Sequence, residues 1–217
     1  MGYEAVIFDL DGTLLDTIDD LTDAVNYALR LCDKPVRTRE EVLLFVGNGI
    51  AKLIQRAVPE GTDEEEQGRV LSFFREYYGI HCQDKTRPYE GIMEVLQELK
   101  KKGVKMAVVS NKADFAVQEL IPQYFPNLFQ VVKGEKEAAG IRKKPAPDMV
   151  EQALTEMACK KENAVYIGDS EVDLQTAKNA EISCIGVSWG FRGREFLEKN
   201  GADMIADNPK EILNFVY

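Results

Sequence analysis

The chain alternates short apolar runs with longer segments of helical periodicity. Residues 3–10 form a continuous apolar run that ends in acidic residues and an Asp-Gly turn at Asp11-Gly12. A run of this length before a turn is typical of a strand buried on both faces. Comparable runs predict further strands at residues 104–109, 129–132, 164–167, 182–187 and 204–206.

Residues 16–84 show helical patterns. Apolar side chains repeat at helical spacing over residues 18–29, and the pairs Thr38/Glu41 and Thr62/Glu65 predict capping boxes at two helix starts. A short helix is expected at residues 50–58. Later helices are predicted over residues 92–103, 114–123, 147–157 and 173–179, and from Asn208, with Pro209 at the first helical position.

Strands that alternate with helices indicate βαβ crossovers and therefore a parallel sheet. We predict an α/β fold with a Rossmann-like, mostly parallel sheet flanked by helices. The helical block interrupts this pattern after the first strand. The expected domains are an α/β catalytic core of residues 1–15 and 85–217, and an all-helical cap inserted at residues 16–84.

The net charge of −10 argues against a nucleic-acid partner and against binding to an anionic membrane, because both require clustered Lys and Arg. No apolar stretch approaches the ~20 residues that span a bilayer, and no signal peptide is apparent, so a cytoplasmic location is expected. The four cysteines lack a C-x-x-C pair and are interpreted as buried, reduced thiols. The single histidine, His81, is expected to be a surface or packing residue.

Polar side chains follow the predicted strands, and ligands of open parallel sheets bind outside the carboxyl ends of strands. We therefore expect these residues to converge at one edge of the sheet. They are Asp9 and Asp11 after the first strand, Ser110, Asn111 and Lys112 after the second, Lys143 and Lys144 before the helix at 147, and Gly168, Asp169, Ser170 and Asp173 after the fourth.

Carboxylates at close range resist joint ionisation, and a divalent cation relieves that repulsion. Oxygen ligands without His or Cys suit Mg²⁺. The hydroxyl of Ser110, the amide of Asn111 and the ammonium of Lys144 could then bind phosphoryl oxygens, and a carboxylate could attack phosphorus to form an aspartyl-phosphate.

Four segments, in this order, resemble the motifs of the haloacid dehalogenase superfamily. Residues 8–14 (FDLDGTL) resemble the first motif, Ser110-Asn111 the second, residues 144–148 (KPAPD) the third, and residues 168–170 (GDS) with Asp173 the fourth. Residues 47–49 (GNG), 88–91 (PYEG) and 189–190 (WG) resemble the phosphoglycolate phosphatase branch. The resemblance implies a small phosphorylated metabolite as substrate, with phosphoglycolate favoured, and a monomer or homodimer.

The resemblance also implies roles for the residues of the first motif. Asp9 would be the nucleophile and a metal ligand. Asp11 would protonate the leaving group and then activate water, and its backbone carbonyl would ligate the metal. Thr13 would have a supporting role.

The remaining motifs would complete the metal and phosphoryl sites. Asp169 would be the third metal ligand, with Asp173 orienting it or a metal-bound water. Ser110 and Lys144 would hold the phosphoryl group, together with Asn111. Lys143 stands where many relatives have glycine. In the cap, Gly47 and Asn48 are candidate substrate-binding residues, although a plain linking turn is nearly as good an interpretation.

Several alternatives stay open at this point. Dehalogenases and phosphonate-cleaving enzymes lack the second aspartate of the first motif, so Asp11 favours phosphoryl transfer. A sugar phosphomutase or a pyrophosphatase would retain it. A receiver-like phosphoaspartate signalling domain would have about half this length and no cap. A non-catalytic binding protein is disfavoured because no motif position carries a disabling substitution.

Overall fold

The computed structural model describes residues 2–217, so residue 1, assigned above to the core, lies outside the described residues. The chain divides into two compact units. The first combines the segment ending at Leu15 with Pro88–Tyr217, and the second is Asp16–Arg87. Short strands β2 (Leu15–Asp16) and β3 (Arg87–Pro88) pair where the chain passes between the units. The second passage lies three residues beyond the boundary expected from the sequence.

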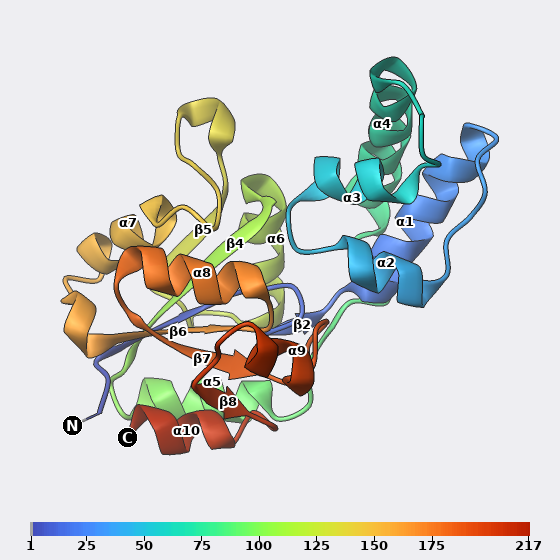
Figure 1. Cartoon of the computed structure of the whole chain (residues 1–217). Coiled ribbons are helices and arrows are strands. Elements are labelled where there is room, and N and C mark those ends of the chain that lie inside the picture. The colour runs from blue at the N-terminus through green and yellow to red at the C-terminus, as the bar shows by residue number, and fades with distance from the viewer. Residues whose placement is uncertain (1) are drawn as a thin grey trace. The chain divides into compact units, whose positions relative to one another are not determined.

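A six-stranded sheet forms the centre of the first unit (Figure 1). Its order is β5-β4-β1-β6-β7-β8, and every pair of neighbours is parallel. The predicted α/β class with a mostly parallel sheet is confirmed. The strands are β1 (Ala5–Phe8), β4 (Lys105–Ala113), β5 (Val131–Glu135), β6 (Ala164–Gly168), β7 (Ser183–Val187) and β8 (Met204–Ala206).

Alternate residues of the strands enter two separate apolar layers, as the period of two requires. Val6 and Phe8 pack with α5 (Ile92–Lys101), α6 (Asp114–Tyr124) and α10 (Glu211–Val216). Ala5 and Ile7 pack with α7 (Asp148–Glu156) and α8 (Glu171–Ala180) on the opposite face. Helices thus cover both faces, and this burial leaves the carboxyl ends of the strands to carry polar groups (Figure 1).

The second unit is helical, with α1 (Ile18–Leu31), α2 (Arg39–Phe45), α3 (Ile50–Ala57) and α4 (Glu64–His81). The predicted capping box at Thr38 and Glu41 is confirmed. The capping prediction at Thr62 is wrong by one residue. Asp63 caps α4 by accepting from the Glu66 backbone N–H, whereas the Thr62 hydroxyl donates to the Pro59 carbonyl.

Two details of the C-terminal region also differ from the prediction. Helix α10 begins at Glu211, because residues 208–210 form a turn in which Asn208 accepts through its carbonyl rather than capping the helix. Helix α9 (Arg194–Lys199) is too short to give a periodic signal and was not predicted. Two 3₁₀ turns, η1 (Glu137–Ala139) and η2 (Lys161–Asn163), complete the elements.

The cysteines and the histidine lie near their expected environments. None of the four cysteines forms a disulfide, and Cys32 and Cys82 are buried whereas Cys159 and Cys184 are only partly so. The partly exposed His81 ring stacks on Tyr77, with ring centroids 4.2 Å apart.

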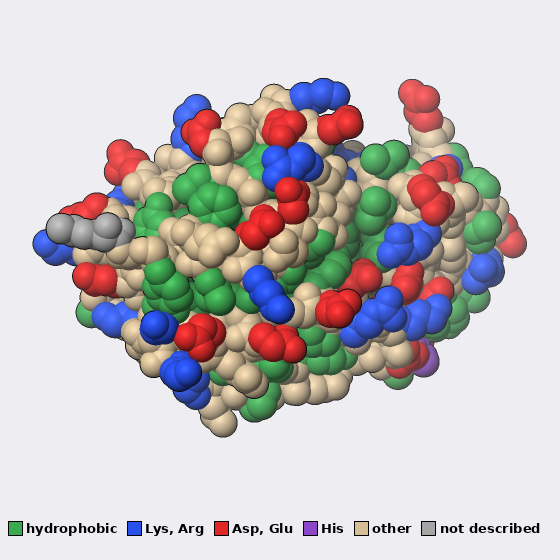
Figure 2. Space-filling model, turned by 90° about the horizontal axis from the view of Figure 1, so that it is seen from below, with side chains coloured by type: hydrophobic (Ala, Val, Ile, Leu, Met, Phe, Trp, Pro, Cys, Tyr) green, Lys and Arg blue, Asp and Glu red, His purple; other side chains and the backbone are tan. Residues whose placement is uncertain are grey.

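No helix within residues 2–217 is long and apolar enough to cross a membrane. On the face drawn in Figure 2, basic and acidic side chains are interspersed. The expectation that no nucleic acid binds stays a prediction.

Candidate active site

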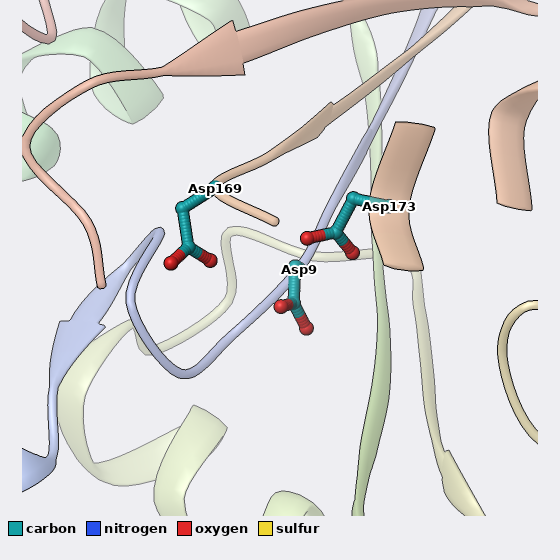
Figure 3. A group of neighbouring side chains, drawn as sticks. All are labelled: Asp9, Asp169 and Asp173. Carbon is teal, nitrogen blue, oxygen red and sulfur yellow. The ribbon is translucent and has the colours of Figure 1, made fainter. Parts of the chain in front are cut away.

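Three buried carboxylates gather at the carboxyl ends of two central strands. Asp9 directly follows β1, Asp169 directly follows β6, and Asp173 lies in the first turn of α8 (Figure 3). They are 8%, 1% and 0% exposed, and one oxygen from each lies within 4.8 Å of the others. Strands β1 and β6 are hydrogen-bonded neighbours, so the sheet itself brings the first two carboxylates together.

Lys144 supplies a buried positive charge to this cluster. Its Nζ lies 2.8 Å from an oxygen of Asp9 and 2.8 Å from an oxygen of Asp173. It also donates to the Tyr166 hydroxyl at 3.1 Å, and that hydroxyl donates in turn to the Val109 carbonyl at 3.0 Å. The ammonium therefore has a fixed position between two carboxylates.

The charges within the cluster do not balance. Burial raises the pKa of Asp9 to about 7, against the lowering effect of Lys144. Burial also raises the pKa of Asp169 well above its usual value, and the charges of Asp173 and Asp9 add to that effect. Burial lowers the pKa of Lys144, but the two neighbouring carboxylates outweigh it and raise that pKa well above the usual value. Three carboxylates thus face one ammonium, a donor set that suits a divalent cation.

The Asp169 carboxylate is held by neighbours on both sides. The Thr13 hydroxyl donates to one oxygen at 3.3 Å, and the Phe191 backbone N–H donates to the other at 2.7 Å. Gly190 allows this approach, since a Cβ there would lie 2.2 Å from the Asp169 Cβ. The Thr13 carbonyl accepts from the Trp189 indole at 3.1 Å, which ties the 189–191 loop to the first motif.

Asp173 is bound firmly within its own helix turn. One of its oxygens accepts from the Ser170 hydroxyl at 2.6 Å and from the Ser170 backbone N–H at 3.1 Å, while the other binds Lys144. These contacts fix the Asp173 carboxylate between Lys144 and the start of α8. The predicted role of Asp173, orienting Asp169 or a metal-bound water, stays a prediction.

Asp11 lies apart from the three clustered carboxylates and has its own cation. The Nζ of Lys112 donates to Asp11 Oδ1 at 3.0 Å, and the Lys112 side chain is only 3% exposed. Asp11 is 21% exposed, so it is the more open of the two motif-one carboxylates. The buried Ser110 hydroxyl accepts from the Lys112 backbone N–H at 3.2 Å.

Asn111 joins the second and third motifs. Its amide oxygen accepts from the Lys144 backbone N–H at 2.8 Å, and its amide nitrogen donates to the Lys144 carbonyl at 3.0 Å. Both amide atoms thus contact the backbone of the lysine that pairs with Asp9. Lys143 points elsewhere, to Glu137 at 3.0 Å.

The two candidate residues of the helical unit lie in the loop between α2 and α3. Asn48 Oδ1 accepts from Arg56 Nη2 at 2.8 Å, and Arg56 Nη1 also donates to the Phe45 carbonyl at 2.8 Å. Gly47 has a φ of 109°, a conformation that favours glycine. These contacts explain the shape of the loop, and substrate binding by Gly47 and Asn48 stays a prediction.

Two residues that contact the charged groups of the site, Tyr166 and Lys112, had no role predicted from the sequence. Tyr166 lies inside a buried strand, where an aromatic residue is ordinarily a packing residue, and nothing in the pattern marked its hydroxyl as a partner of Lys144. Lys112 follows the second motif directly. Its place beside the motif was the one sign in the sequence that Lys112 lies near the site. The pairing of Lys112 with Asp11 depends on side-chain directions that only the structure gives.

Similarity to known proteins identifies the family of this chain. Residues 6–187 match the family model of the haloacid dehalogenase-like hydrolases. This chain belongs to that family.

Two curated relatives match nearly the whole chain. The phosphoglycolate phosphatase of Pseudomonas savastanoi pv. phaseolicola is 35% identical over 95% of this chain and 78% of the relative. The pyrophosphatase PpaX of Listeria monocytogenes serotype 4a is 32% identical over 97% of this chain and 95% of the relative.

A solved structure from Lactobacillus delbrueckii subsp. bulgaricus, provisionally named a phosphoglycolate phosphatase, has a TM-score of 0.93. It is 42% identical and covers 98% of this chain and 97% of its own. The resemblance to this superfamily and to its phosphoglycolate phosphatase-like branch is confirmed, and so is the prediction of a phosphatase.

Proposed function

We propose that this protein is a magnesium-dependent phosphatase that hydrolyses a small phosphate monoester, with 2-phosphoglycolate as the favoured substrate. The observation that carries the proposal is the Asp9 carboxylate, buried at the end of β1 and held by Lys144 at 2.8 Å beside two further carboxylates. Aspartyl-phosphate chemistry requires a nucleophilic carboxylate, a fixed ammonium, and enough further negative charge to bind a divalent cation.

In the first step, an oxygen of Asp9 attacks phosphorus, and the bond between phosphorus and the leaving oxygen breaks. The electron pair goes to that oxygen, which takes a proton from the Asp11 carboxyl. Lys144 stays beside Asp9 and offsets negative charge on the phosphoryl oxygens. The buried Ser110 hydroxyl is the neutral donor that we assign to the phosphoryl group.

In the second step, Asp11 accepts a proton from water, whose oxygen attacks the phosphorus of the aspartyl-phosphate. The bond to Asp9 breaks, the carboxylate is restored, and inorganic phosphate leaves. Asp11 suits this double role because it is more open than Asp9. General acid–base catalysis of this kind contributes typically 10²–10⁴-fold to the rate.

Asp9, the Asp11 carbonyl and Asp169 would hold the Mg²⁺. The metal supplies positive charge that stabilises the phosphoryl oxygens in the transition state. Support comes from the donor set itself, which consists of hard oxygens and contains more negative charge than Lys144 balances. Asp173 would keep Lys144 and the start of α8 in place.

The relatives favour two substrates. Phosphoglycolate is favoured because a curated relative 35% identical to this chain and a solved structure 42% identical to it both carry that name. Inorganic pyrophosphate is the second candidate, because the PpaX relative matches over nearly its full length.

A phosphate-release assay over small phosphorylated metabolites, with and without Mg²⁺, tests the proposal. We expect release that requires Mg²⁺, greatest for 2-phosphoglycolate, and loss of release in Asp9→Asn with the fold retained by circular dichroism. Asp203→Asn, an exposed carboxylate, is the matched control and should retain full activity. Unchanged turnover by Asp9→Asn, with deamidation excluded by mass spectrometry, would overturn the assignment.

A further inference from the structure

Lys112 is a buried cation to which the mechanism above gives no role. Its side chain is 3% exposed, and its Nζ donates to Asp11 Oδ1 at 3.0 Å. Lysine is almost never buried to this degree without a charged partner. The burial therefore indicates that the fold places this ammonium beside the Asp11 carboxyl rather than leaving it in solvent.

The position of Lys112 relative to the reaction follows from its partner. Asp11 is the proton donor, so its carboxyl must meet the leaving oxygen of the substrate. Lys112 is in contact with that carboxyl and therefore lies on the leaving-group side. Lys144 is in contact with Asp9 and lies on the side of the nucleophile. With the roles proposed above for the two aspartates, the two buried ammonium groups would lie at opposite ends of the phosphoryl transfer.

We propose that Lys112 selects substrates whose leaving group carries a negative charge close to the ester oxygen. Two chemical classes meet this requirement: a carboxylate one carbon from the ester oxygen, and a second phosphoryl group. This inference rests on the proposed function, because it uses the role of Asp11 as the proton donor.

The physical basis is charge complementarity at a site with little water. A substrate anion near Lys112 is weakly screened, since the ammonium is buried, and charge-assisted contacts are stronger than those between neutral groups. A neutral leaving group has no anionic substituent to place beside this cation, so it lacks the additional charge-assisted contact. The same ammonium also favours the leaving oxygen as negative charge develops on it, so part of the effect belongs to the transition state.

The test compares two substrates that differ only in this charge, 2-phosphoglycolate and its neutral amide, 2-phosphoglycolamide. We measure kcat/KM for both with Mg²⁺ in the wild type, Lys112→Met and Lys112→Arg. The wild type should prefer the carboxylate by about 10- to 100-fold, the range expected for one charge-assisted contact. Lys112→Met should bring the ratio close to one even if both rates fall, and Lys112→Arg should retain most of the preference.

Lys136→Met is the matched control, because Lys136 is an exposed lysine that pairs with Asp114 at 2.9 Å and its loss changes the net charge equally. It should keep the wild-type ratio. An unchanged ratio in Lys112→Met, or an equal loss of preference in Lys136→Met, would overturn the proposal.

If Lys112→Met is unstable, the wild type still decides, because equal kcat/KM for both substrates contradicts the proposal. A failed proposed function is distinguishable, since the wild type would then release phosphate from neither substrate.

Discussion

At the scale of single residues, the site divides into two ion pairs with different surroundings. Asp9 and Lys144 are both buried, whereas Asp11 is partly open and has Lys112 as its cation. A nucleophile benefits from a fixed, dry position, and an acid–base group must reach both the leaving oxygen and water. The structure therefore gives each motif-one aspartate the environment that its proposed task needs.

Replacing Asp11 tests this division of roles. Asp11→Asn should lower kcat by about 10²–10⁴-fold, because the amide can neither protonate the leaving oxygen nor take a proton from water. Both half-reactions should slow, which rapid-quench measurement of phosphoenzyme formation and decay would show separately. A variant that retains the wild-type rate of both steps would contradict the role of Asp11.

The sequence predicted that the carboxylates would lie close together, because they come after strands and the carboxyl ends of parallel strands meet at one edge of the sheet. Asp9 and Asp169 come together through the pairing of β1 with β6. It could not predict that Asn111 would bind the Lys144 backbone through both amide atoms, or that Tyr166 would contact the ammonium. Those contacts depend on side-chain rotamers and on how a loop returns to the sheet.

At the scale of elements, β4 and β5 extend beyond the rest of the sheet, and their pairing depends on a close approach. The Gly134 N–H donates to Asp114 Oδ1 at 3.0 Å, and a Cβ at position 134 would lie 2.3 Å from the Asp114 Cα. Their register also shifts between Val109 and Ala113. Strand β5 starts two residues later than the apolar run that predicted it. The predicted strand at 129–132 is therefore displaced to Val131–Glu135.

Gly134→Ala should destabilise the protein by about 1–3 kcal/mol, since the methyl group would force the backbone of β5 away from the start of α6. Gly68→Ala is the matched control. Gly68 lies within α4, nothing comes within 4 Å of a Cβ there, and alanine is the better helix former. Urea unfolding should show opposite signs for the two substitutions. Equal effects would mean that the close approach at Gly134 has no consequence for stability.

Errors in the element boundaries arise where neighbouring residues compete for one function. Thr62 and Asp63 can both cap a helix, and the structure uses Asp63. Asn208 can cap a helix or form a turn, and here it forms the turn before Glu211. Local propensity alone does not separate these outcomes, because tertiary packing decides where the first helical residue lies.

At the scale of the whole molecule, the chain leaves the α/β unit after Leu15 and returns at Pro88. Apolar periodicity showed that a helical block interrupts the strand pattern. The strand order, with β1 between β4 and β6, came only from the structure, because long-range pairing leaves no periodic signal in one chain. The number of chains in the active assembly stays a prediction.

A buried carboxylate joins the two ends of the helical unit. Asp20, 2% exposed, accepts from the Lys85 backbone N–H at 2.9 Å, and from the Thr86 N–H at 2.8 Å and hydroxyl at 2.7 Å. Asp20→Asn should destabilise by about 1–3 kcal/mol, because buried donors lose their charged acceptor. The loss of hydrogen-exchange protection should concentrate in residues 16–87.

Asp19→Asn is the neighbouring control. Asp19 forms an exposed ion pair with Arg39 at 2.8 Å, and such pairs contribute about 0–1 kcal/mol. If Asp19→Asn and Asp20→Asn lower protection equally, Asp20 does not hold the ends of the unit together.

In the proposed mechanism, Asp9 accepts the phosphoryl group. Acid quenching of the protein during turnover of 2-phosphoglycolate with Mg²⁺, followed by borohydride reduction and peptide mass spectrometry, locates an acyl phosphate directly. The reduced residue should be at position 9, and the signal should disappear in Asp9→Asn. Continuous phosphate release with position 9 unmodified at every quench time, or with the label on another residue, would contradict it.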